Sequence, residues 1–145
     1  MQYMLIMRSD DAAVAEYKEI PFEQIIEAMG KYNESMMEAG VMIGGEGLSD
    51  ASEGFVVDFS ADPPLVTDGP YGETKELFNG FWILEVASRE EAAEWASRCP
   101  LGPGSKLEVR RINEEADFAD FADNEYLQKE AGWREQEARL RGENG

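Results

Sequence analysis

The side chains best suited to chemistry gather in residues 66–76, with the sequence VTDGPYGETKE. The tripeptide Asp68-Gly69-Pro70 predicts a tight turn. It is followed by side chains that can donate or accept a hydrogen bond or a proton, namely Tyr71, Glu73, Thr74, Lys75 and Glu76. A desolvating pocket would raise the pKa of a carboxyl group such as Asp68 toward neutral pH. The catalytic candidates are therefore Asp68, Glu73 and Lys75, with Tyr71 and Thr74 as ligand-orienting candidates.

The same segment also has a purely structural interpretation. Asp68 can accept backbone N–H groups within the turn, and Gly69 can supply a positive φ. Lys75 can pair with a neighbouring glutamate at the surface, where an ion pair contributes little. For Asp68 we favour this structural role.

Other kinds of catalytic or metal site have little support in the sequence. The chain has no histidine, and its single cysteine, Cys99, follows a predicted helix whose dipole disfavours a thiolate. Asp58, Asp62 and Asp68 lie close in sequence, but their spacing does not match a calcium-binding loop. We therefore predict neither a metal nor another cofactor.

Composition limits the partners of the chain. Its 145 residues suit one folded domain, and one cysteine excludes an intramolecular disulfide, which favours a cytoplasmic location. The net charge of −18 extends over the whole sequence and would repel phosphate backbones, so we predict no direct binding to nucleic acid. No apolar run approaches the length needed to span a membrane, and we expect no membrane association.

Hydrophobic periodicity predicts the elements that must position the candidate residues. Residues 22–39 form the clearest helix, because an apolar face that includes Phe22, Ile26, Tyr32 and Met36 opposes a charged face. A second helix follows Ser88, which forms a capping box with Glu91. The expected strands are residues 2–8, 41–48, 55–60, 65–67, 78–86 and 106–112.

The strand at residues 41–48, VMIGGEGL, loosens at Gly44, Gly45 and Gly47, which suggests a bulge or a close approach of the backbone. A small molecule could bind between this bend and the loop at residues 68–76. The binding candidates outside the loop are Arg8, Gly45 and Glu46.

The composition changes after Ile112, so we divide the chain into a domain at 1–112 and an acidic extension at 113–145. Apolar side chains in the extension recur at helical spacing, from Phe118 and Phe121 to Tyr126 and Trp133. This stripe predicts a helix that docks on its own domain or across a subunit interface.

The segments MQYMLIM, EAGVMIGGEGL, VTDGPYGETKE, NGFWILEV, EEAAEWASRCP and LEVRRI occur in this order. With them the chain resembles the YCII-related proteins, specifically the subgroup named after an Asp-Gly-Pro-Phe (DGPF) motif. The resemblance covers residues 1–112 and implies a ferredoxin-like α+β fold with two helices, paired as a dimeric α/β barrel. We therefore expect a homodimer, in which the partner covers the sheet face that two helices cannot cover. The alternative is a monomer whose C-terminal helix covers that face.

The resemblance does not imply one reaction. Related YCII proteins carry a histidine paired with an aspartate, whereas this chain has Met29 near the equivalent position and Tyr71 where the DGPF motif has phenylalanine. Two classes of function follow. The first is a small-molecule pocket protein that could be an enzyme without a catalytic histidine. The second is a regulatory interaction module linked to transcription initiation, because DGPF domains occur fused to sigma-factor-like regions.

Overall fold

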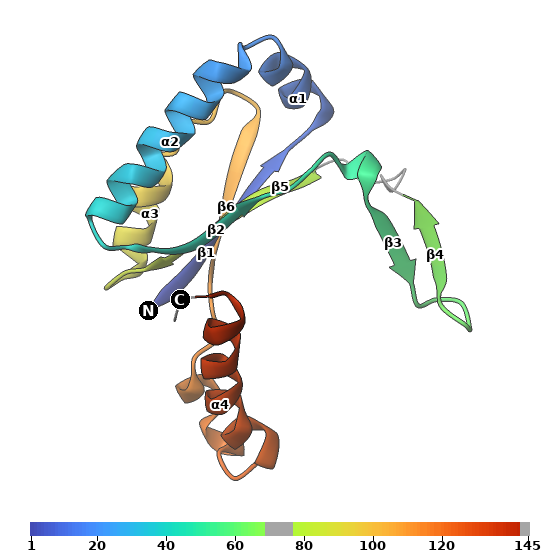
Figure 1. Cartoon of the computed structure of the whole chain (residues 1–145), viewed down its shortest axis with the longest axis vertical. Coiled ribbons are helices and arrows are strands. Elements are labelled where there is room, and N and C mark those ends of the chain that lie inside the picture. The colour runs from blue at the N-terminus through green and yellow to red at the C-terminus, as the bar shows by residue number, and fades with distance from the viewer. Residues whose placement is uncertain (69–76, 143–145) are drawn as a thin grey trace. The chain divides into compact units, whose positions relative to one another are not determined.

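The computed structural model describes residues 1–68 and 77–142 (Figure 1). Its contacts divide the chain into two units, Met1–Ile112 and Asn113–Gly145, each of which is described by itself. The elements of the first unit are β1 (Gln2–Ser9), α1 (Asp11–Lys18), α2 (Phe22–Glu38), β2 (Met42–Gly47), the 3₁₀ turn η1 (Ala51–Glu53), β3 (Phe55–Asp58), β4 (Leu65–Asp68), β5 (Leu77–Glu85), α3 (Arg89–Ser97) and β6 (Ser105–Arg111).

Four of these strands form an antiparallel sheet in the order β2-β5-β1-β6. The first and last strands of the unit therefore lie side by side, and β5 joins β1 to β2. With α2 after β1 and α3 after β5, this order is that of a ferredoxin-like fold. The expected α+β class and its antiparallel sheet are confirmed.

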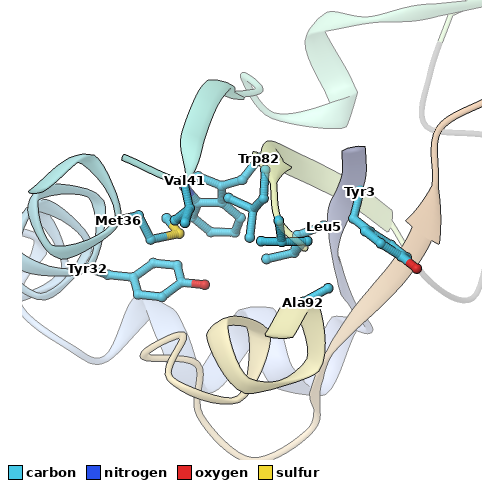
Figure 2. Close-up of a cluster of buried hydrophobic side chains, with 9 residues drawn as sticks. Tyr3, Leu5, Tyr32, Met36, Val41, Trp82 and Ala92 are labelled. Carbon is cyan, nitrogen blue, oxygen red and sulfur yellow. The ribbon is translucent and has the colours of Figure 1, made fainter. Parts of the chain in front are cut away.

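The main core lies between one face of this sheet and helices α2 and α3 (Figure 2). Leu5 of β1, Leu84 of β5 and Met36 of α2 are its largest fully buried side chains. The Tyr32 and Trp82 rings meet edge to face, with centroids 5.4 Å apart. This geometry brings opposite parts of the two ring quadrupoles together, which fixes α2 against β5.

Helix α2 begins after Pro21 and ends before Gly40, whose φ of 71° suits a residue without a Cβ. Its apolar face is only partly buried. Tyr32 and Met36 are in the core, but the side chain of Phe22 is 73% exposed and that of Ile26 is 55% exposed. The most deeply buried positions of α2 are therefore Tyr32 and Met36, while Phe22 and Ile26 near its start are exposed.

The second face of the sheet carries Ile6, Phe81 and Ile83, which alternate with the core residues along their strands. Phe78 is also on this face and is exposed, and its ring centroid lies 6.3 Å from that of Phe81. None of these four residues belongs to the core formed with α2 and α3. An apolar sheet face therefore remains outside the main core of the described unit.

The structure contains two elements that differ from the expectation. Helix α1 was not predicted, because its eight residues carry a weak apolar stripe. Strands β3 and β4 lie near their predicted positions, but they form a separate two-stranded hairpin. Its apolar side chains are largely exposed, and Phe59 in the connecting turn is 79% exposed.

The second unit is not the single helix that the sequence suggested. It contains a 3₁₀ segment, η2 (Glu115–Phe121), and then helix α4 (Glu125–Leu140). Asn124 begins α4 by accepting a hydrogen bond from the Tyr126 backbone N–H. Because the helix starts there, Phe118 and Phe121 do not share a continuous helical face with Tyr126.

Candidate functional site

A cleft with a volume of about 870 Å³ lies on the face of the sheet that carries α2. Its walls come from α1, α2 as far as Asn33, the segment around η1 and the adjoining parts of β1, β2, β5 and β6. Phe22 and Ile25, at the start of the α2 apolar face, line this cleft, whereas the exposed Ile26 does not. Small-molecule sites have volumes of roughly 300–1,000 Å³, so the cleft has the size of such a site.

Glycines form much of the cleft floor. Gly45 and Gly47 of β2 pair with Trp82 and Gly80 of β5, respectively. A Cβ on Gly80 would come within 2.9 Å of the Glu46 carbonyl oxygen, whereas a Cβ on Gly47 would have no atom within 4 Å. The two strands approach closely at Gly80, and the space above Gly47 is left open.

Three methionines supply apolar walls around this floor. Met7 comes from β1, Met29 from α2 and Met42 from β2, and all three line the cleft. Each is unbranched, so it can change rotamer more readily than a β-branched residue.

A hydrogen bond from Trp82 orients the side-chain amide of Asn33, which lies in the same cleft. Trp82 Nε1 donates to Asn33 Oδ1 at 2.8 Å, and both residues line the cleft. Indole nitrogen is only a donor, so the asparagine atom facing it must be oxygen. The Asn33 amide nitrogen therefore points elsewhere, and in the described part of the chain it has no hydrogen-bond acceptor.

Further polar groups line the cleft, among them Ser9, Asn79 and Asp50. Asn79 Nδ2 donates to the Ser9 hydroxyl, which joins β5 to β1. At the rim, Asp50 accepts a hydrogen bond of 2.9 Å from the Ser52 backbone N–H. Hydrogen bonds from Ser52 lower the pKa of Asp50, and the positive charge of Lys18 acts in the same direction.

A model of the YCII-related domain matches residues 1–116. The chain belongs to the YCII-related family. A similar protein is an uncharacterized protein of Rhizobium meliloti (strain 1021), which is 26% identical over 96 residues, or 66% of this chain and 77% of that protein.

In this YCII-related chain the predicted site residues do not all lie in one place. Gly45 and Glu46 both line the cleft, but Glu46 pairs with Phe81 and alternates with Gly45 along β2, so it belongs to the second sheet face. Arg8 follows Met7 on β1 and forms an ion pair of 3.0 Å with Glu108 of β6, outside the cleft residues. Asp68 is the exposed last residue of β4 and pairs with Phe55. Its role stays a prediction.

The other candidates of the predicted loop, Tyr71, Glu73, Thr74 and Lys75, lie outside the described residues. In sequence, the loop directly precedes β5, whose residues Asn79 and Gly80 line the cleft.

Sequence reasoning missed Asn33, Trp82 and Asn79 as site residues of this YCII-related protein. One signal was present for Asn33. It follows Met29 by four positions, so it is a polar residue close to the apolar stripe of α2. The residue that completes the hydrogen bond, Trp82, is 49 positions away, and no local pattern joins the two.

Cys99 is a protected thiol. Burial raises its pKa to about 12, so it is protonated at neutral pH. Burial also raises the pKa of Tyr32, whose hydroxyl donates to the Trp95 carbonyl oxygen at 2.9 Å. Neither group is ready to act as a nucleophile or a base near neutral pH.

Residues 1–68 and 77–142 contain no cluster of three or more cysteine, aspartate or glutamate residues arranged to hold a metal ion. None of the helices among them is sufficiently long and apolar to cross a membrane.

Proposed function

We propose that this YCII-related protein binds a small molecule in the cleft between α1, α2 and the sheet. The observation that carries the proposal is the glycine floor below an opening of about 870 Å³ with apolar walls. Closed packing would be more stable at such a place, because burial of a Leu or Ile side chain is worth about 1.5–3 kcal/mol. The unfilled volume at Gly47 is therefore unfavourable for folding alone and suits a ligand.

The family resemblance supports the same location. Met29, which occupies the position near the histidine of related YCII proteins, lines this cleft. A thioether neither donates nor transfers a proton at neutral pH, so the site would keep its place while losing that base. We propose a DGPF-like protein in which residues 68–76 contribute to ligand binding, with Asp68, Glu73 and Lys75 as the groups that any reaction would use.

The test is a thermal-shift screen of a metabolite library against the wild-type protein and Gly47→Leu. The leucine would extend from a position whose Cβ has no neighbour within 4 Å, so it fills the cleft without a backbone clash. Gly30→Leu is the matched control, because Gly30 is exposed on α2 and also has open space around it.

We expect ligands that raise the melting temperature of the wild type and of Gly30→Leu, but not that of Gly47→Leu. A ligand present at 100 times its Kd stabilises the folded state by about 2.7 kcal/mol, which is easily detected. Ligands that stabilise Gly47→Leu as strongly as the wild type would bind elsewhere and contradict the proposal. A library without any binder would also count against it.

A homodimer is part of the proposal. Phe78, Phe81 and Ile83 form an apolar strip on the second sheet face, beside Ile6, which is already buried. A second copy could cover this strip and complete a dimeric α/β barrel. The alternative is a monomer in which the acidic C-terminal extension covers the same face.

Exposed apolar residues favour interaction as a second candidate function. Phe55, Phe59, Leu65 and Val66 of the β3–β4 hairpin are each at least 57% exposed. A two-stranded hairpin is marginally stable alone, so these side chains suit a protein contact. A regulatory role in transcription initiation would then act through protein partners. Pull-down of RNA polymerase subunits by the wild type but not by a Phe55→Ser/Phe59→Ser variant would support it.

A further inference from the structure

The charge of the cleft limits the kind of ligand that it can hold. Its charged lining residues are Lys18, Glu46 and Asp50, and all three are exposed. Glu46 pairs with Phe81, so it alternates with the floor residues of β2 and belongs to the second sheet face.

With Glu46 on the other sheet face, Lys18 and Asp50 are the charged side chains at the exposed rim of the cleft among the described residues. Lys18 carries a positive charge and Asp50 a negative one, so the two contributions cancel. The rim therefore has no surplus of positive charge, and the chain as a whole carries a net charge of −18. A carboxylate or phosphate would be repelled by the protein and would meet no cation in the described interior of the cleft.

The polar groups of the interior favour an uncharged hydrogen-bond acceptor. Asn33 Oδ1 is already occupied by Trp82 Nε1, so the Asn33 side chain has two N–H donors to offer. It lies one helical turn after Met29, which lines the same cleft. A ligand oxygen placed beside Asn33 would accept a hydrogen bond while the rest of the molecule contacted the methionine walls.

We infer that the cleft takes a neutral, mostly apolar molecule carrying a carbonyl or hydroxyl oxygen, which accepts a hydrogen bond from Asn33 Nδ2. This inference rests on the proposed function and adds the chemical class of the ligand. The hydrogen bond from Trp82 makes Asn33 a preorganised donor, because the amide need not rotate when the ligand enters.

Three probes of nearly equal shape test the ligand class. They are 2-acetylnaphthalene with a carbonyl oxygen, 2-ethylnaphthalene without one, and 2-naphthoate with a negative charge. Binding is measured by titration calorimetry on the full chain. We expect the ketone to bind about 2- to 12-fold more tightly than the hydrocarbon, the ratio expected for one neutral hydrogen bond, and the anion to bind most weakly.

Two variants assign the preference to Asn33. Asn33→Asp keeps an oxygen for Trp82 Nε1 but replaces the amide donor with a carboxylate, and Asn33→Ala removes the donor without adding charge. Both should bind the ketone and the hydrocarbon with equal affinity. Gln24→Glu makes the same change of charge as Asn33→Asp at an exposed position of α2, so it should retain the wild-type ratio.

The proposed function and this inference can fail separately. If Gly47→Leu abolishes probe binding but the wild type prefers 2-naphthoate, or the ketone preference survives in both Asn33 variants, the cleft binds ligands and our assignment of the class is wrong. If Gly47→Leu binds all three probes like the wild type, the site itself is misplaced and both proposals fall. Failure of all three probes to bind would overturn the inference, while library ligands blocked by Gly47→Leu would still support the cleft.

Discussion

The paired glycines of the cleft floor give the sharpest stability prediction. Gly80 of β5 and Gly47 of β2 face each other across two neighbouring strands. A Cβ added to Gly80 would lie 2.9 Å from the Glu46 carbonyl oxygen and 3.4 Å from Gly47 Cα, so the strand backbones would have to separate. At Gly47 the added Cβ would meet no atom within 4 Å.

The same substitution should therefore have opposite effects at the two positions. Overpacking against a rigid neighbour costs about 1–3 kcal/mol, and we expect Gly80→Ala to lower the free energy of unfolding by about 2 kcal/mol. In a chain of this size the melting temperature would fall by roughly 4–8 °C. Gly47→Ala should be neutral or stabilising by up to about 1 kcal/mol, because alanine reduces the entropy of the unfolded chain.

Urea unfolding followed by circular dichroism measures both variants. The comparison is internal, since each variant adds one methyl group to the same pair of strands. A Gly80→Ala protein as stable as Gly47→Ala would refute the close approach of β2 and β5 and with it our account of the cleft floor.

Four further predictions concern the core, the buried thiol, the assembly and the turn. Met36→Ala should lower the free energy of unfolding by about 2–5 kcal/mol, measured by urea denaturation, because Met36 is completely buried. Burial raises the pKa of Cys99 from 9.0 to about 12, so its stabilising effect is complete below pH 9 and is lost as the pH rises toward 12. Denaturation between pH 8 and 11 should then show a shallower decline for Cys99→Ala than for the wild type, and equal slopes would contradict this assignment. Sedimentation equilibrium at micromolar concentration should give the mass of a dimer, whereas a clean monomer mass would remove the barrel from our proposal. Asp68→Asn should leave the melting temperature unchanged while Asp68→Ala costs about 1 kcal/mol, if Asp68 builds the turn. Loss of ligand binding in a stable Asp68→Asn protein would instead make the carboxylate functional.

Most of the ferredoxin-like unit could be predicted from local patterns. Half of the capping box predicted at Ser88 is present: the Ser88 hydroxyl accepts from the Glu91 backbone N–H at 3.1 Å, but the Glu91 carboxylate accepts from the Ala87 backbone N–H and not from that of Ser88. Helix α1 was missed because its short sequence has little amphipathic character. The apolar face predicted for α2 is only partly buried: Phe22 and Ile26 are exposed, and of these two Phe22 lines the cleft.

The candidate site was harder to predict, because its geometry depends on tertiary contacts. Gly45 could be found, since a glycine within a strand signals unusual packing on its own. The role of Asn33 could not, because it depends on an indole from another element. Likewise, Arg8 has the chemistry of a ligand-binding residue, but strand alternation places it with Glu108 rather than with the neighbouring Met7 in the cleft.

The three methionine walls have a consequence for selectivity. A cleft shaped by Met7, Met29 and Met42 can adapt to its guest, because unbranched thioether side chains exchange rotamers at little cost. The glycine floor cannot adapt in this way, since it is backbone. Complexes with differently shaped guests should thus share one sheet geometry and differ in their methionine conformations. The protein would therefore discriminate poorly between ligands of different shape. Its selectivity would depend mainly on the hydrogen bond from the Asn33 amide.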